Sequence, residues 1–180
     1  MQVETHLINN CIGLLQQAFD LIEQIDHQVY SSTSPISPRA GIGGHLRHVL
    51  DFYQSFMSGI GSGRVDYNLR RRDAAVEQDR VQACRRIRET IVELRSLSLA
   101  IQDDDDLNHL LVATEDDGAT TQSWSASSVL RELDSLQSHT IHHYSLIAML
   151  LRSQAFEPGE EFGVAPSTLK HWREEAACAR

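Results

Sequence analysis

Four long segments of this chain carry apolar residues at steps of three and four positions, and this periodicity limits the possible folds more than any other feature. The segments span residues 5–29, from about 38–41 to 58, 74–100, and from about 125–127 to 153. Such spacing places the apolar side chains on one face of an α-helix. Four amphipathic helices bury these faces most simply against one another. We therefore expect an all-α fold, a four-helix bundle with antiparallel neighbours.

The segments between the expected helices contain the residues that usually interrupt helices. Residues 31–44 concentrate Ser, Pro and Gly and predict a linker, and glycines at 59, 61 and 63 predict the end of the second helix. The fourth helix is expected to take its N-cap from Ser125 or Ser127. The four consecutive aspartates at 103–106 are expected in solvent beyond the third helix, where they do not oppose its dipole.

Two smaller elements are also expected. A small hairpin between the third and fourth helices would pair residues 110–112 with 119–121 around the turn signal Asp117-Gly118. The tail predicts a short helix after Ser167. We place the domain boundary so that residues 1–157 form the bundle and residues 158–180 form a C-terminal extension.

Charge and cysteine content narrow the class of protein. Sixteen basic and 25 acidic residues give a net charge of -9, which argues against binding to nucleic acid through phosphate contacts. Three cysteines without a CxxC pair favour a reducing, cytoplasmic location over a disulfide framework. The longest apolar run covers only residues 146–151, so we expect neither a membrane span nor a signal peptide.

The histidines of the second and fourth helices have the spacing of metal ligands. His139 and His143 are four residues apart, so they lie one turn apart on one helix face and can converge on one ion. The second helix adds His45 and His48, and bundle sites draw ligands from facing helices. The spacing alone does not decide whether His45 or His48 is the third ligand; we choose His48. Three imidazoles would leave coordination positions open, as in catalytic sites. The alternative for the histidine pair is a set of hydrogen bonds in the core.

Other polar residues near these positions have two interpretations. His142 lies away from the centre of the apolar face and is expected at the rim or on the substrate side. Glu132 and Asp51 are each suited to accept a ring N–H or to act as a base, although a salt bridge to an arginine is the commoner fate. Neither is expected to be a ligand.

Three short segments carry a resemblance to a known family: IGGHLRHVLD at residues 42–51, REL at 131–133 and SHTIHHY at 138–144. With them, residues 5–153 resemble the DinB-like family. The resemblance implies a four-helix bundle in an up-down-down-up arrangement, often dimeric. It also implies a divalent metal held by one histidine of the second helix and the HxxxH pair of the last, here His48, His139 and His143. Relatives in that family include S-transferases and isomerases that use bacillithiol, mycothiol or glutathione.

Together these observations predict a metal-dependent enzyme of the hydrolase or thiol-dependent S-transferase type. We expect a homodimer that binds a small-molecule substrate, with a low-molecular-weight thiol as a candidate. Imidazole ligands suit zinc, nickel, iron, cobalt or manganese, so the identity of the metal stays open. The alternative is a non-catalytic metal-binding or stress-response bundle.

Three consecutive arginines at 70–72 lie outside the pattern of the DinB-like family. They are suited to recognise an anionic substrate through forked hydrogen bonds. The commoner fate of such residues is a solvated loop, or ion pairs with Asp73 and Glu77.

Overall fold

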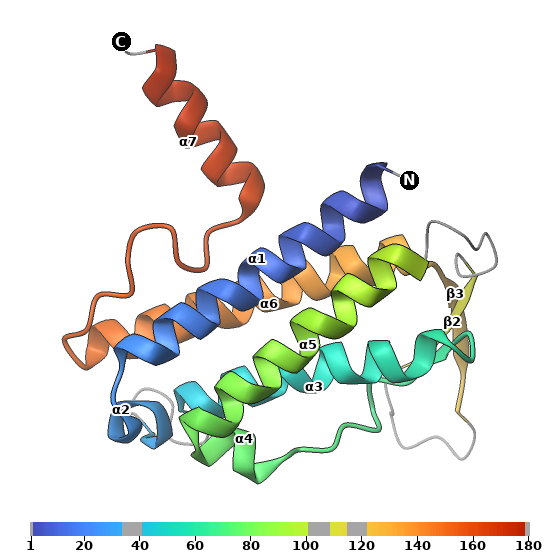
Figure 1. The fold of residues 1–180 in the computed structure, drawn as a ribbon, viewed down its shortest axis with the longest axis horizontal. Coiled ribbons are helices and arrows are strands. Elements are labelled where there is room, and N and C mark those ends of the chain that lie inside the picture. Colours follow the sequence, from blue (N-terminus) through green and yellow to red (C-terminus); the bar gives the residue numbers. More distant parts are fainter. Residues whose placement is uncertain (1, 34–40, 101–108, 115–121, 179–180) are drawn as a thin grey trace.

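A computed structural model describes residues 2–33, 41–100, 109–114 and 122–178 (Figure 1). The structure is mostly helical, as the sequence predicts. Its four long helices are α1 (Gln2–Gln24), α3 (Ile42–Ile60), α5 (Arg80–Ala100) and α6 (Val129–Ser153). Their apolar faces form one continuous core. No helix in these described ranges is both long and apolar enough to cross a membrane.

The arrangement of the four helices differs from a bundle in which all neighbours are antiparallel. Helices α1 and α3 each pack against both α5 and α6. Figure 1 shows that α3 and α5 run in one direction and α1 and α6 in the other, so two of these four neighbour pairs are parallel. Because α3 and α5 are parallel, the chain between them must return along the bundle. We call the part of this return at residues 66–73 the crossover segment.

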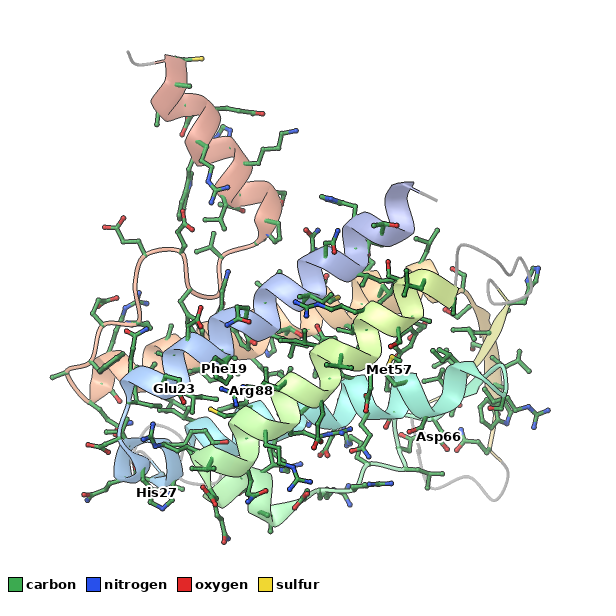
Figure 2. All side chains as sticks on the ribbon, viewed as in Figure 1. Phe19, Glu23, His27, Met57, Asp66 and Arg88 are labelled. Carbon is green, nitrogen blue, oxygen red and sulfur yellow. The ribbon has the colours of Figure 1, made fainter. Side chains whose placement is uncertain are left out.

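Where α1 and α5 pack together, the contacts combine apolar and charged groups. Figure 2 labels Phe19 and Glu23 of α1 and Arg88 of α5 in this region. The guanidinium carbon of Arg88 lies 4.5 Å from the centroid of the Phe19 ring, a cation–π contact. The thiol of Cys84 donates to the Glu23 carboxylate at 3.7 Å. This pair of helices is thus joined by specific contacts at its rim as well as by the core.

Two of the helices expected from the sequence are broken by aspartate caps. The first ends at Gln24, and Asp26 then caps the short helix α2 (His27–Ser31) by accepting from the backbone N–H of Val29. The third is divided into α4 (Ala74–Gln78) and α5 by Asp79, which has extended backbone angles. An aspartate side chain that binds a free N–H favours a new helix start over continuation of the old one.

The other two helix boundaries also differ from those expected. The second helix starts at Ile42 and continues through Ile60, so Gly59 does not end it. The fourth starts at Val129, and its N-cap is Ser128 instead of Ser125 or Ser127. Both of those serines lie in a strand, because this part of the chain is held in a sheet before the helix begins.

A small sheet closes the end of the bundle where α3 finishes and α6 starts (Figure 1). Its order is β1 (Arg64–Val65), β2 (Leu110–Ala113) and β3 (Trp124–Ser127). Strand β2 pairs parallel to β1 and antiparallel to β3, with Leu110 opposite Ser127. The first strand of the expected hairpin is confirmed, but its antiparallel partner is β3.

Several sequence predictions fall outside the described residues. They are the core of the linker at 34–40, the four aspartates at 103–106, and the turn and second strand expected at 117–121.

The C-terminal extension packs along α6 and then leaves the bundle. The ring of Phe162 stacks on that of buried Tyr144, with centroids 4.8 Å apart and planes 8° apart. Helix α7 (Pro166–Cys178) then projects away from the four long helices (Figure 1). The short helix expected in the tail is therefore present, whereas the domain boundary at residue 157 stays a prediction.

Candidate metal centre

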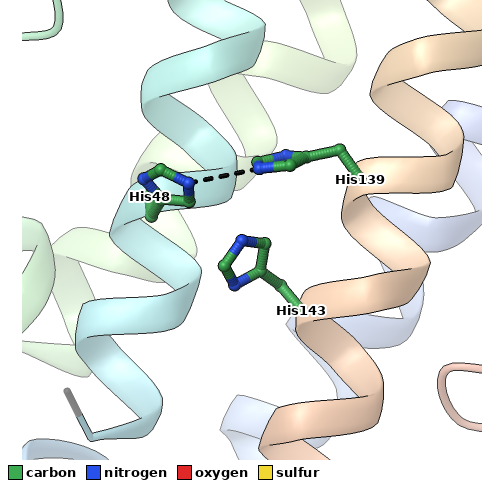
Figure 3. A group of neighbouring side chains, drawn as sticks. All are labelled: His48, His139 and His143. Carbon is green, nitrogen blue, oxygen red and sulfur yellow. Dashed lines mark hydrogen bonds between the residues drawn. The ribbon is translucent and has the colours of Figure 1, made fainter.

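Three histidines from two neighbouring helices converge in the space between those helices (Figure 3). His48 comes from α3, and His139 and His143 come from successive turns of α6. Each offers one ring nitrogen, and these three atoms all lie within 4.8 Å of one another. We call this group the three-histidine cluster. It consists of the three residues expected from the sequence.

The spacing within the cluster fits ligands of a single ion. The Nε2 atoms of His48 and His139 are 3.2 Å apart. Two nitrogens that bind the same tetrahedral zinc ion are expected about 3.3 Å apart, because each Zn–N bond is about 2.0–2.1 Å. A hydrogen bond between the two rings would have a similar length. One nitrogen of His143 also points toward this pair (Figure 3), as a shared ion would require and a hydrogen bond between two rings would not.

Burial keeps the cluster histidines neutral near pH 7, which is the form that binds metal. Desolvation, followed by the charges of His143 and Arg70, lowers the pKa of His48 from 6.5 to about 4. Desolvation and the neighbouring His48 lower the pKa of His139 to about 4. Desolvation and His139 lower the pKa of His143 to about 3. No proton therefore has to leave these rings before an ion binds.

The structure groups His48, and not His45, with His139 and His143. His45 lies outside the three-histidine cluster, and its Nδ1 is 3.0 Å from Nδ1 of His143. One of these two atoms must carry the proton that joins them. If it is Nδ1 of His143, Nε2 of that ring is free to bind an ion, and His45 fixes the tautomer and the orientation of the ring. His45 thus lies next to His143, outside the cluster.

His142 and Asp51 lie near the cluster without joining it. His142 is exposed on α6, with its ring in edge contact with that of His143. The Asp51 carboxylate accepts from the Arg47 guanidinium at 2.8 Å. This is the commoner of the two fates expected for Asp51, a salt bridge.

Within the described residues, Glu132 makes neither the contact with a histidine ring nor the salt bridge to an arginine considered from the sequence. Its buried carboxylate accepts from the hydroxyl groups of Tyr67, at 2.8 Å, and Ser127. Neither partner is an imidazole or an arginine. The Tyr67 ring in turn stacks on Phe52 with centroids 5.0 Å apart. Glu132 therefore holds an aromatic residue of the crossover segment in place.

Phe52 forms the side of the cluster, a role that the sequence analysis missed. Its ring stacks on that of His139, with centroids 4.1 Å apart, and makes an edge contact with that of His48. The signal was present in the spacing, because Phe52 follows His48 by four residues and so shares its face of α3. Stacking on Phe52 limits the rotation of the His139 ring, although Nδ1 of His139 is buried and lacks a hydrogen-bond partner within the described chain.

The three arginines of the crossover segment have different surroundings. Arg70 is half-buried, with its guanidinium carbon 5.1 Å from the centroid of the Phe52 ring. Arg71 is exposed and donates to the side-chain oxygen of Gln54 at 3.0 Å. Arg72 is exposed. The ion pairs considered with Asp73 and Glu77 do not occur among the described residues, because Asp73 caps α4 and Glu77 pairs with Arg47.

No family model matches the chain. FK506-binding protein 5 of Rhizopus delemar is 31% identical over 173 residues. The alignment covers 93% of this chain and 38% of that protein, so the chain spans less than half the length of this relative.

Proposed function

We propose that the chain is a DinB-like, divalent-metal-binding protein and that the three-histidine cluster is the centre of a metal-dependent enzyme. The observation that carries this proposal is the convergence of three neutral imidazoles from α3 and α6. The reaction that we propose is a hydrolysis or a thiol-dependent S-transfer on a small molecule. The homodimer implied by the family resemblance belongs to the same proposal.

Three protein ligands are fewer than a divalent ion normally takes, which favours catalysis over a purely structural role. Structural zinc sites are closed by four protein ligands, whereas catalytic sites keep a position for water or substrate. When bound, the ion would act as a Lewis acid that makes a coordinated water or thiol more acidic. The same chemistry is open to zinc, nickel, iron, cobalt and manganese.

The residues around the cluster orient its rings and shape the approach to it. His45 holds His143 through the contact between their Nδ1 atoms. Phe52 limits the rotation of His139 by stacking, and Tyr67 extends this aromatic wall toward Glu132. The rings of the cluster remain half-buried, so a small molecule can reach them. These contacts would preorganise the ligands, which limits the reorganisation needed when an ion binds.

Elemental analysis of protein purified without a chelator or a histidine tag tests the proposal. We expect about one ion per chain in the wild type and in the control His142→Ala, which removes an exposed histidine of the same helix. The variants His48→Ala and His139→Ala should lose the ion. An absence of metal from the wild type, even after reconstitution with several divalent ions, would refute the metal site.

The enzymatic part of the proposal needs a separate measurement. Metal-loaded protein should hydrolyse a small-molecule ester or couple a thiol to an electrophile, and the metal-free protein and His48→Ala should not. Stoichiometric metal without turnover across both reaction types would favour the alternative, a non-catalytic metal-binding bundle stabilised by its ion.

A further inference from the structure

Arg70 is the one arginine of the crossover segment whose charge lies close to the three-histidine cluster. Its guanidinium packs over Phe52, and the Phe52 ring also contacts His139, His48 and Tyr67. After the effects of burial and of neighbouring imidazoles, the Arg70 charge also contributes to the lowered pKa of both histidines. The guanidinium and two histidines of the cluster thus contact the same aromatic ring.

The hydrogen-bonding capacity of Arg70 is not used within the described part of the chain. Its Nε atom is buried without a hydrogen-bond partner, and no described ion pair includes Arg70. By contrast, Arg47 binds two carboxylates and Arg71 binds Gln54. A buried N–H without an acceptor costs free energy, so this position favours a partner that brings an acceptor.

The charges at the cluster also favour an anionic partner. All three cluster ligands are neutral imidazoles, so none of them offsets the charge of a divalent ion. Arg70 adds a further positive charge, which acts on His48 and His139. The Glu132 carboxylate is already bound by the hydroxyl groups of Tyr67 and Ser127. With a divalent ion bound, the local charge is positive even when the Glu132 carboxylate is counted, although the chain as a whole carries a charge of -9.

We propose that Arg70, packed over Phe52, forms a subsite for a carboxylate or phosphate group of the small molecule that reaches the three-histidine cluster. This proposal rests on the proposed function, and it adds a substrate class: a small anion. A guanidinium stacked on a ring by one face keeps its N–H edge available for hydrogen bonds in its plane. That edge binds two oxygens of a carboxylate or phosphate at once, which an ammonium group cannot do.

Calorimetric titration of the zinc-loaded protein with small probes tests this subsite. Malonate represents the carboxylate, inorganic phosphate the phosphate, and malonamide is the uncharged analogue of malonate. We expect Arg70→Gln to weaken binding of the preferred anion about 10- to 100-fold, because charge-assisted forked hydrogen bonds are lost. Arg72→Gln is the matched control, because it removes the same charge from an exposed residue of the same segment. Arg70→Lys, which keeps the charge and loses the fork, should bind with intermediate affinity.

The probes and variants give results that support or overturn the proposal. Tighter binding of malonate or of phosphate would show whether the subsite takes a carboxylate or a phosphate group. Equal binding of malonate, phosphate and malonamide by the wild type would overturn the proposal, and so would equal losses in Arg70→Gln and Arg72→Gln. Zinc content and thermal unfolding of Arg70→Gln should match those of the wild type. If they do not, the anion affinity of Arg70→Lys, which keeps the charge, tests the proposal instead.

A titration of the metal-free protein separates this proposal from the metal site. The ¹⁵N resonance of Arg70 Nε, assigned by its loss in Arg70→Lys, should shift when the preferred anion is added and stay unchanged with malonamide. If the resonance shifts but the protein binds no metal even after reconstitution, the result would support the subsite and refute the metal centre. Metal binding without a shift, together with unchanged anion affinity in Arg70→Gln, would refute the subsite alone.

Discussion

The lowered pKa values of the cluster histidines predict that metal binding resists acid. A histidine at its usual pKa of 6.5 is about 90% protonated at pH 5.5, so three such ligands would lose about 1,000-fold in zinc affinity between pH 7.5 and 5.5. In this protein the pKa values are about 4 for His48 and His139 and about 3 for His143. The neutral form therefore persists as the pH falls through 6.5 and is lost only near pH 4.

The expected loss of affinity over the same pH range is correspondingly small. With these pKa values, proton competition at pH 5.5 would weaken zinc binding by less than about 1.2-fold. The rings are only half-buried, and if solvent screening halved the pKa shifts the loss would still be only about threefold.

Competition for zinc against a chromophoric chelator, corrected for the chelator's own protonation, measures the affinity at pH 7.5 and 5.5. A designed peptide with three exposed histidines provides a reference with ordinary pKa values. A loss near 1,000-fold in the folded protein would refute the reasoning, because it would show that burial and mutual repulsion do not keep these rings neutral.

Two further predictions concern the residues that support the cluster and the fold. His45→Ala should lower zinc affinity about 10- to 100-fold in the same competition assay, because Nδ1 of His45 contacts His143, a proposed ligand. The control His142→Ala should bind zinc with an affinity close to that of the wild type. Equal effects of the two variants would contradict the role of His45. Gly43→Ala should lower the free energy of unfolding by at least about 2 kcal/mol in urea, because its methyl group would overlap the backbone carbonyl of Glu77. Gly13→Ala, in open space on α1, should instead raise it by about 0.5–1 kcal/mol, and a similar loss in both would show that the overlap is not the cause.

Local patterns in the sequence determined which segments are helices and which histidines are candidates. The three- and four-residue periodicity predicted the four long helices, because it reflects the geometry of the helix itself. The interval between His139 and His143 placed both on one face of α6 for the same reason. The breaks at Asp26 and Asp79 were missed, because an aspartate cap inside a periodic segment leaves the apolar pattern intact.

Tertiary structure decided how these local elements meet. Both His45 and His48 lie on α3, and only the rotation of that helix against α6 puts His48 in the cluster and His45 behind His143. Two-residue strand β1 carries too short a pattern to be recognised, and its pairing with β2 joins segments about 45 residues apart.

The surroundings of the cluster depend even more on contacts that are distant in sequence. Tyr67 and Glu132 are 65 positions apart and meet only because the crossover segment returns along the bundle. The same path gives three consecutive arginines three environments, with Arg70 packed over Phe52 and Arg72 exposed to solvent. Sequence alone fixes which chemical groups are available. Their distances, burial and partners follow from the packing of α3, α6 and the crossover segment.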